Sequence, residues 1–288
     1  MENFKIISDS SCDLPEDLLK QYDIDLVPFK ITFDGGASYL LDGVDITIEE
    51  FYDRMSAKGV FPKTSLPGVA DYADAFKPYL TEGRDIFCVC LTSEFSGSYQ
   101  SAVNAAAMLL DEFPDRKIKV LDSRLVTLLQ GLLVTDIGEY RAEGKTIEEI
   151  WDLVNSYKNE NYVYLTVDTL EYLQKGGRVG KASALAGGLL NIKPIIVFKD
   201  GALNPHSKIR GRKKAIVEVV DLVAAFLKGK ESEYRTWVLS SRASDVDEMA
   251  TYAKEKGLDI IGISKIGSTV TVHGGPGLVG IAIMKNRP

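Results

Sequence analysis

The chain has 288 residues, of which 45% are hydrophobic, and it carries a formal net charge of −7. This length allows one large α/β domain or two smaller ones, and the acidic balance argues against a general nucleic-acid-binding protein, whose footprint would be basic. Three cysteines are too few for a disulfide framework, and two histidines cannot complete a Cys/His zinc pattern.

The first residues, MENFKIISDSS, lack the basic and apolar regions of a signal peptide. The longest apolar stretches, such as 125–134, have about half the length that spans a bilayer. The sequence therefore predicts a soluble, cytoplasmic protein.

Strand-like and helix-like segments alternate through the first half of the chain. Short apolar runs predict strands at 4–10, 25–35, 85–92 and 117–123. Helix-opening residues and amphipathic runs predict helices at 15–22, 47–57, 65–80, 99–110, 126–144 and 146–160. This order predicts a mostly parallel sheet with helices on both faces.

The pattern changes after about residue 158, where several strands are joined by short turns. The predicted strands are 161–169, 193–206, 235–242, 258–266 and 268–275, and the predicted helices are 170–176, 213–229 and 246–257. Short connections favour antiparallel pairing. We therefore predict two α/β domains, over 1–157 and 158–288, the second with a mixed or antiparallel sheet.

A corner rich in hydroxyls, TSEFSGS, joins the strand that ends near Leu91 to the following helix. A helix start offers unpaired amide groups and a partial positive charge, and Ser93, Ser96 and Ser98 can add hydroxyl donors. Gly97 lets a ligand approach the backbone closely. One interpretation is that Ser96 only caps the helix, and another is that the corner binds an anion.

Two further interpretations of this corner concern a nucleophile and a phosphate. A nucleophilic Ser96 needs flanking glycines in the pattern G-x-S-x-G, which are missing, and would use His273 or His206 as its base. A phosphate-binding Walker loop needs a lysine beside the turn, and none is present. A carboxylate, which is smaller and less charged, is the better candidate.

A second hydroxyl corner occurs at 61–72, where Thr64 and Ser65 precede a proline and a helix. If the two helix starts face each other, their hydroxyl and amide donors can surround one anion. Ordinary helix capping is the alternative for each corner.

The segment 268–286 contains a formal G-x-G-x-x-G match, but only eight residues follow Gly280. A dinucleotide site needs a further helix, strand and acidic residue, so we interpret the glycines as a tight turn between antiparallel strands. His273 then ends the first strand, and the adjacent glycines leave its ring accessible to a carboxylate. Asp9 and Asp13 lack a third nearby carboxylate, so turn and cap roles fit them better than a metal site.

Six segments together carry a resemblance that covers nearly the whole chain. They are SDSSCDLP (8–15), TSLPG (64–68), SGSYQSA (96–102), LEYLQKGGRVG (170–180), KPIIVFKDGAL (193–203) and HGGPGLVG (273–280). Their order and spacing resemble the DegV family. Leu66 and Ser98 differ from the residues that the family usually has in the second and third segments.

The resemblance implies a long-chain fatty acid bound between two α/β domains, with no catalysis by this chain and no cofactor or metal. It also implies a role as the carrier subunit of a bacterial fatty acid kinase, which presents the carboxylate to a separate ATP-using subunit. The implied carboxylate ligands are Thr64, Ser65, Ser96, the Gly97 amide, His273 and Gly274. Arg210 and Arg212 are the implied contacts, in the basic segment 208–214, to the kinase or transiently to a membrane surface.

The apolar segment 182–198, rich in small residues, is a candidate wall for the acyl tail, and core packing is the alternative for each of its residues. The basic segment can equally be a hydrated turn and helix start. Two other functions remain open from the residues. One is a serine hydrolase using Ser96 and His273, and the other is a sensor whose ligand alters partner binding.

Overall fold

The computed structural model describes residues 4–33, 40–41, 44–55, 60–187, 191–241 and 243–288. Parts of four predicted segments lie outside these residues. They are the ends of the strand 25–35, of the helix 47–57 and of the strand 235–242, and the middle of the apolar segment 182–198. The chain forms two compact units. The first consists of Met1–Thr47, Thr64–Asn159 and Pro288, and the second of Ile48–Lys63 and Glu160–Arg287.

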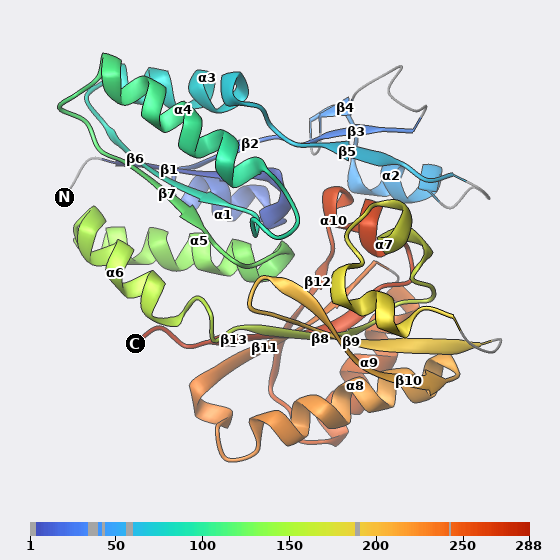
Figure 1. The fold of residues 1–288 in the computed structure, drawn as a ribbon. Helices are drawn as coiled ribbons and strands as arrows, with labels where there is room; N and C mark the ends of the chain where they lie inside the picture. Colours follow the sequence, from blue (N-terminus) through green and yellow to red (C-terminus); the bar gives the residue numbers. More distant parts are fainter. Residues whose placement is uncertain (1–3, 34–39, 42–43, 56–59, 188–190, 242) are drawn as a thin grey trace. The chain divides into compact units, whose positions relative to one another are not determined.

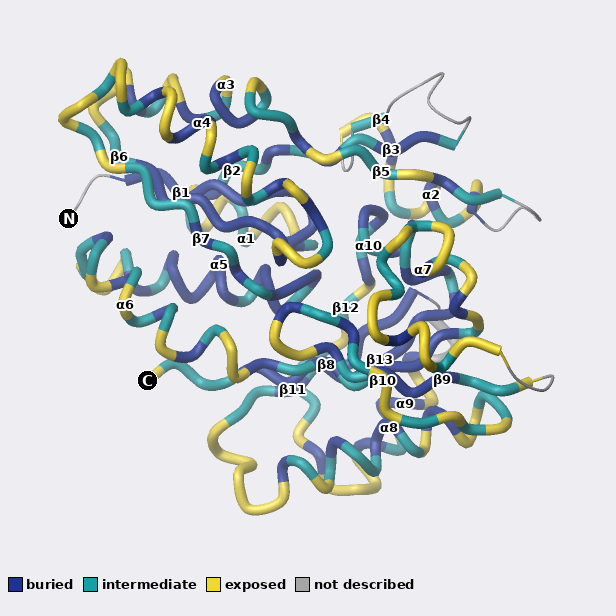
Figure 2. The backbone as a smooth tube through the Cα atoms, in the orientation of Figure 1, coloured by how far each residue is buried: buried dark blue, intermediate teal, exposed yellow. Residues whose placement is uncertain are grey.

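The first unit is built on a four-stranded sheet with the order β2-β1-β6-β7. Its strands are β1 (Phe4–Asp9), β2 (Ile24–Val27), β6 (Asp85–Cys90) and β7 (Ile118–Asp122). All neighbours pair in parallel. Every residue of β1 is buried, as expected for a central parallel strand covered on both faces, and Figure 2 shows this strand dark along its length.

Helices cover both faces of this sheet, which confirms the predicted architecture (Figure 1). One face carries α3 (Val69–Thr81) and α4 (Ser98–Glu112), and the other carries α1 (Glu16–Gln21), α5 (Thr127–Ala142) and α6 (Ile147–Tyr157). Thr146 and Glu149 form the capping box that starts α6. Apolar side chains of α3 and α4, including Tyr72 and Phe76, pack on the sheet as one core.

Shorter elements complete the first unit. The turn η1 (Ser10–Cys12) follows β1, and a small sheet of order β4-β3-β5 contains β3 (Lys30–Thr32), β4 (Leu40–Leu41) and β5 (Lys63–Ser65). The strand β5 leads directly into the loop before α3, so it fixes the start of the second hydroxyl corner.

The second unit is built on a six-stranded mixed sheet with the order β10-β9-β8-β13-β11-β12. Its strands are β8 (Tyr162–Thr166), β9 (Ile192–Lys199), β10 (Ala202–Arg210), β11 (Tyr234–Ser240), β12 (Ile260–Lys265) and β13 (Val279–Lys285). Only β11 and β12 pair in parallel among these described strands. Asp200 and Gly201, both with positive φ, form the two-residue turn of the β9–β10 hairpin.

The helices α8 (Arg212–Leu227) and α9 (Ala243–Glu255) pack on one face of this sheet around a large apolar core. Figure 1 shows α7 (Glu171–Lys175) and α10 (Ser268–Gly274) on the other face. The remaining elements of the unit are α2 (Ile48–Met55), η2 (Gly180–Leu185) and η3 (Glu231–Glu233).

The predicted strand over 268–275 is wrong, because these residues form the helix α10. Alternating β-branched residues favoured a strand, but the helix buries Ser268, Thr269, Thr271 and Val272, which share no alternating face. Packing against α7 therefore overrides local propensity. Consequently the following glycines connect a helix to β13, and the predicted turn between two antiparallel strands is also wrong.

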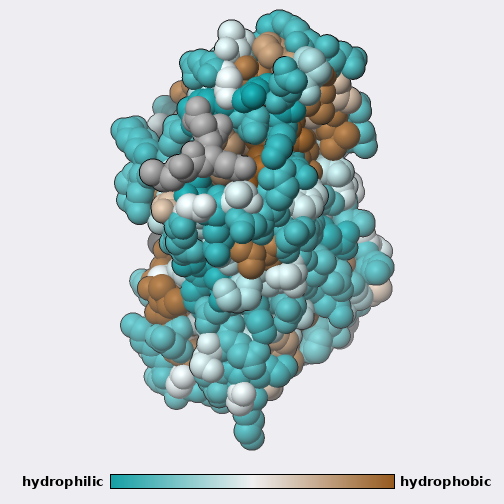
Figure 3. All heavy atoms as spheres, turned by 90° about the vertical axis from the view of Figure 1, so that its left-hand side faces the viewer, coloured by the Kyte–Doolittle hydropathy of each residue, from teal (hydrophilic) through white to brown (hydrophobic). Residues whose placement is uncertain are grey.

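Within the described residues, none of the helices has both the length and the apolar character needed to cross a bilayer. The face in Figure 3 is mainly hydrophilic, with hydrophobic atoms in small separate groups. Scattered groups of this kind are normal on a protein surface.

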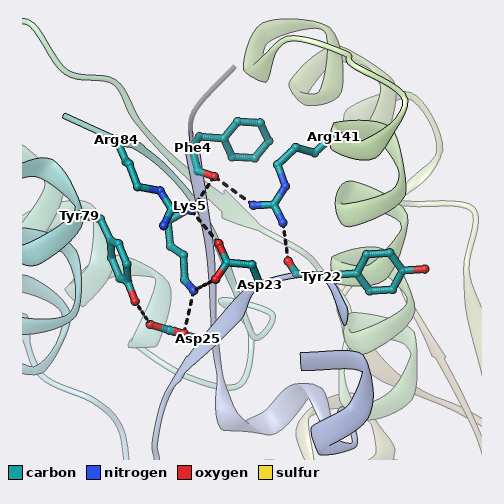
Figure 4. A network of polar contacts seen from close by, with 8 residues as sticks. All are labelled: Phe4, Lys5, Tyr22, Asp23, Asp25, Tyr79, Arg84 and Arg141. Atoms are coloured by element: carbon teal, nitrogen blue, oxygen red, sulfur yellow. Dashed lines mark hydrogen bonds and ion pairs between the residues drawn. The ribbon is translucent and has the colours of Figure 1, made fainter. Parts of the chain in front are cut away.

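An ionic network joins the amino ends of three strands of the first unit (Figure 4). The ammonium of Lys5, whose side chain is only 4% exposed, lies 2.5 Å from Asp23 Oδ1 and 2.9 Å from Asp25 Oδ1. Arg84 contacts the other Asp23 oxygen at 2.7 Å. Burial acts to raise the pKa of Asp23, but bonds from Lys5 and Arg84 outweigh it and hold this pKa below its ordinary value. The stability that Asp23 contributes is thus present above about pH 4 and lost as the pH falls through the lowered pKa.

We expect the double variant Asp23→Asn/Asp25→Asn to lower the free energy of unfolding by about 2–3 kcal/mol, because it strands a buried ammonium. Lys5→Met should cost only about 1 kcal/mol, because both carboxylates are about half exposed and stay hydrated. Urea denaturation of the two variants and the wild type measures the difference. Equal losses in the two variants would contradict this assignment.

Candidate functional site

The strand order of the first unit reverses between β1 and β6. After β1 the chain continues to β2 on one side, and after β6 it continues to β7 on the other side. All four strands are parallel, so their carboxyl ends share one edge of the sheet. Ligands of open α/β sheets bind outside the carboxyl ends at such a reversal. The corner that follows β6 is therefore the first unit's candidate site.

Three serines lie around the start of α4, and the structure separates their roles. The Ser93 hydroxyl donates to Asp122 Oδ2 at 2.6 Å, and the Ser98 hydroxyl donates to Asp9 Oδ2 at 3.0 Å. The Ser96 hydroxyl accepts a bond from the Ser98 amide at 3.1 Å, which leaves its own proton able to bind a ligand. Ser96 is therefore the hydroxyl of this corner best suited to hold an anion. The interpretation that Ser96 caps the helix was wrong, because the N-cap residue is Gly97 and no side chain makes a capping bond there.

The second hydroxyl corner lies beside the first. Thr64 and Ser65 end β5 and are partly buried. A Cβ added to Gly97, the residue that precedes α4, would lie 3.4 Å from Leu66 Cδ2. The loop from β5 to α3 thus passes next to the exposed Gly97 backbone, and the structure brings the two predicted corners together within the first unit.

The start of α3 is capped by the chain itself. The Gly68 amide donates to Asp71 Oδ2 at 2.7 Å, and the Lys30 ammonium lies 3.2 Å from the same oxygen. Because this helix start already has a carboxylate, it is a poorer anion site than the start of α4. The second corner therefore offers its hydroxyls rather than the helix end.

Asp9 is fully buried at the end of β1, beneath the Ser96 corner. Its carboxylate accepts bonds from the Ser11 and Ser98 hydroxyls, the Leu91 amide and the Gln130 side chain, over 2.6–3.0 Å. Burial raises the pKa of Asp9, and these bonds oppose the rise. No group of acidic, cysteine or histidine side chains among the described residues could hold a metal ion. Asp9 and Asp13 are the N-cap and C-cap residues of η1, as the predicted turn and cap roles require, and the buried Asp9 carboxylate also links η1 to the residue after β6, to α4 and to α5.

His273 lies in the second unit, near the end of α10. A Cβ on Gly176 would lie 2.2 Å from His273 Nδ1, so glycine at 176 is required to admit the ring. Burial, with a smaller effect of the Arg178 charge, lowers the pKa of His273 to about 4. The imidazole is therefore neutral at pH 7, with one nitrogen that donates and one that accepts.

The glycines after His273 are explained by close packing. A Cβ on Gly274 would lie 2.5 Å from Leu278 Cδ1, and a Cβ on Gly277 would lie 2.2 Å from Asp168 Oδ2. Gly275, with φ +82°, ends α10 in a backbone conformation that favours glycine. The G-x-G-x-x-G pattern thus results from packing within the second unit, in agreement with its rejection as a dinucleotide loop.

The basic segment contains two different kinds of arginine. Arg210 is exposed at the end of β10. The Arg212 side chain is only 18% exposed and lies 3.5 Å from Asp168 Oδ1, which also binds Lys193 at 3.0 Å. Arg210 is therefore accessible for docking, whereas Arg212 belongs at least partly to the fold.

A pocket of about 260 Å³ lies in the second unit, beside the predicted tail wall. Leu185, Ala186 and Ile192 of that segment line it, together with the carboxylates of Asp168 and Glu171. It is smaller than typical ligand pockets, and the carboxylates make it unsuitable for an acyl tail. The tail channel stays a prediction, as does the convergence of His273 with the two hydroxyl corners.

Sequence reasoning gave no role to three residues that the structure places around the candidate ligands. These residues are Tyr72, Gln130 and Arg178. Arg178 belongs to the LEYLQKGGRVG segment, and its guanidinium donates to the Gly176 carbonyl at 2.6 Å. The only signal in the sequence was a basic residue among glycines, which is too common to indicate a site.

Comparison with known proteins agrees with this architecture. A model of the DegV family, described as uncharacterised proteins, matches residues 3–286. A DegV domain-containing protein of Caldanaerobacter subterraneus subsp. tengcongensis is 35% identical over 286 residues, with 98% of each chain covered. A stearic acid-binding protein from Eubacterium ventriosum has a TM-score of 0.92 at 33% identity, with 98% of each chain covered. A Thermus thermophilus DegV family protein, described by its fatty acid binding, has a TM-score of 0.87 at 29% identity, covering 99% and 100% of the two chains.

The fold defines a class of two-unit α/β proteins in which the Ser96 corner lies at the strand-order reversal of the first unit. The family model, the relatives and the solved structures all assign the chain to one family. The chain belongs to the DegV family.

The low pKa of His273 can be measured directly, because the chain has only two histidines. We expect the His273 ring signals in an NMR titration to shift near pH 4, with the variant His206→Gln providing the assignment. Arg178→Gln should raise this pKa only slightly, because burial is the larger cause. Titration of His273 near its ordinary value of about 6.5 would contradict the burial that the structure shows.

Proposed function

We propose that this protein binds a long-chain fatty acid and carries it without transforming it. The observation that carries the proposal is the stearic acid-binding relative, which matches nearly the whole chain with a TM-score of 0.92. The Ser96 corner supports it independently, since it combines an available hydroxyl proton, a helix start and an accessible glycine backbone at the reversal of strand order.

The proposed ligands for the carboxylate are uncharged. The first unit contributes the hydroxyls of Thr64, Ser65 and Ser96 with the Gly97 amide, and the second unit contributes His273 and Gly274. His273 fits as a neutral donor, because its pKa of about 4 keeps the ring unprotonated at pH 7. Each hydrogen bond to a charged acceptor contributes about 1.5–3 kcal/mol, so three or four donors are sufficient.

The acyl tail has a different role from the head group. Removing a sixteen-carbon tail from water is worth on the order of 10 kcal/mol, at about 0.8 kcal/mol for each methylene. In a cell the tail can equally enter a membrane, so burial of the tail alone does not favour the protein. The carboxylate contacts therefore decide whether the fatty acid leaves the membrane.

We further propose that the bound acid is presented to an ATP-using fatty acid kinase subunit. The chain has no Walker lysine beside its hydroxyl corner, so the phosphoryl chemistry would come from the partner. The basic segment around Arg210 is the proposed docking surface for this partner or, transiently, for an anionic membrane.

A hydrolase remains the second candidate, because Ser96 lies at a strand-to-helix corner. Both histidines belong to the second unit, and the bond at the Ser96 hydroxyl comes from an amide rather than from a base. Turnover of a chromogenic ester that is abolished in Ser96→Ala would favour the hydrolase over the carrier.

We expect the purified protein to retain close to one C14–C18 fatty acid per chain, measured by organic extraction and mass spectrometry. Ser96→Ala and Thr64→Ala should each reduce retention several-fold, because each removes one donor to the carboxylate. Ser93→Ala is the matched control, since its hydroxyl donates to Asp122 instead. Full retention in both Ser96→Ala and Thr64→Ala would refute the proposed head-group site.

We expect Arg210→Glu to reduce acyl phosphate formation with the kinase subunit at least tenfold while the bound fatty acid is retained. Arg210 is exposed, so its reversal changes a docking charge without breaking a contact like that of Arg212 with Asp168. Lys254→Glu, an exposed site on α9, controls for the change in net charge. The docking proposal fails if Arg210→Glu and Lys254→Glu have the same activity.

A further inference from the structure

Three buried side chains from different elements form a continuous chain of hydrogen bonds below the two hydroxyl corners. The Tyr72 hydroxyl lies 2.6 Å from Ser98 Oγ, and the Ser98 hydroxyl donates to Asp9 Oδ2 at 3.0 Å. Tyr72, Ser98 and Asp9 each have an exposed fraction of 0%. Because Ser98 has a single proton and gives it to Asp9, the Tyr72 hydroxyl must be the donor to Ser98.

Each member fixes a different part of the candidate site. Tyr72 lies in the first turn of α3, four residues after Gly68 of the second corner. Ser98 is the first residue of α4 and gives its amide to the Ser96 hydroxyl. Asp9 ends β1, at the strand-order reversal, and its remaining donors come from Ser11, Leu91 and Gln130.

We propose that Tyr72, Ser98 and Asp9 are positioning residues. They fix the position of the 64–68 corner relative to the 96–97 corner, so that donors from both corners can bind one carboxylate. This inference rests on the proposed fatty acid binding and adds residues that do not touch the ligand. It also explains why three hydroxyls near α4 have different roles. Ser93 and Ser98 donate to Asp122 and Asp9, whereas the Ser96 hydroxyl accepts a bond from the Ser98 amide and can give its own proton to a ligand.

The geometry favours positioning over a purely structural role. A structural role needs only buried groups with satisfied hydrogen bonds. Ser11 of η1, the Leu91 amide after β6 and Gln130 of α5 already supply such bonds to Asp9. The Tyr72–Ser98 bond adds a link between the two helices that follow the two corners. Loosening that link should misplace the head-group donors by a fraction of an ångström while the apolar core of α3 and α4 remains.

The test compares a charged and an uncharged ligand with the same tail. We expect Tyr72→Phe to weaken stearate binding about tenfold in delipidated protein but to weaken 1-octadecanol binding less than twofold, because only the carboxylate depends on the aligned donors. Titration calorimetry or displacement of a fluorescent fatty acid measures both affinities. Ser98→Ala should lower the ratio of the stearate affinity to the octadecanol affinity by a similar factor. The double variant Tyr72→Phe/Ser98→Ala should lower this ratio no further than either single variant.

Tyr79→Phe is the matched control, because Tyr79 lies on the same helix and its hydroxyl donates to Asp25 in the network at the other end of the sheet (Figure 4). It should leave the ratio unchanged. An unchanged ratio in Tyr72→Phe, or an equal fall in Tyr79→Phe, would overturn the positioning role alone. Failure of the wild-type protein to bind stearate would instead refute the proposed function.

Discussion

The buried carboxylate of Asp9 is the constraint on which the first unit depends. Among the described residues it has four hydrogen-bond donors and no ion-pair partner. An unpaired buried charge is costly, so each donor must stay in place for the fold to tolerate it. Those donors come from η1, the residue after β6, the start of α4 and the first turn of α5. One side chain therefore links the carboxyl ends of β1 and β6 to the starts of α4 and α5, at the edge that carries the candidate site.

The two ends of this sheet use charge in opposite ways. At the amino end, Lys5 and Arg84 form ion pairs with carboxylates that are partly exposed (Figure 4). At the carboxyl end, the buried Asp9 carboxyl group accepts bonds from neutral donors, and none of these donors is the Ser96 hydroxyl. The charges at the amino end thus stabilise the fold, whereas the carboxyl end keeps a hydroxyl donor that a ligand can use.

Elements with local signals were predictable from the sequence. The apolar run at 85–92 and the helix predicted over 146–160 are specified by neighbouring residues, and both were confirmed. The single strand predicted over 193–206 was wrong, because Asp200 and Gly201, both with positive φ, turn the chain between β9 and β10. The helix at 268–274 was not predictable, because its β-branched residues favour a strand and only packing against α7 selects the helix. The strand order that creates the reversal between β1 and β6 is likewise a tertiary property, although it decides where a ligand can bind.

In the candidate site, too, the sequence indicates the local features, whereas the partners of each side chain depend on the tertiary structure. Sequence indicated the Ser96 corner and the Thr64 corner, and the structure brings them together, but Ser93, Ser96 and Ser98 look equivalent until their partners are known. Those partners, Asp122 and Asp9, are distant in the chain, as is the Asp168 that binds Arg212. Spacing in a sequence can therefore suggest which residues lie at a corner, whereas only the fold shows which proton remains available.

The absence of a cationic ligand from the proposed head-group site has a physical rationale. A buried salt bridge would require desolvation of both charges, and breaking it to release the carboxylate would strand one of them. Hydroxyls, an amide and a neutral imidazole can return to water-like partners when the ligand leaves, because none carries a full charge. The low pKa of His273 keeps it in this neutral set over the physiological range. Under the proposed function, such a set of ligands would hold the carboxylate by hydrogen bonds that a partner can replace, which is the balance that a carrier requires.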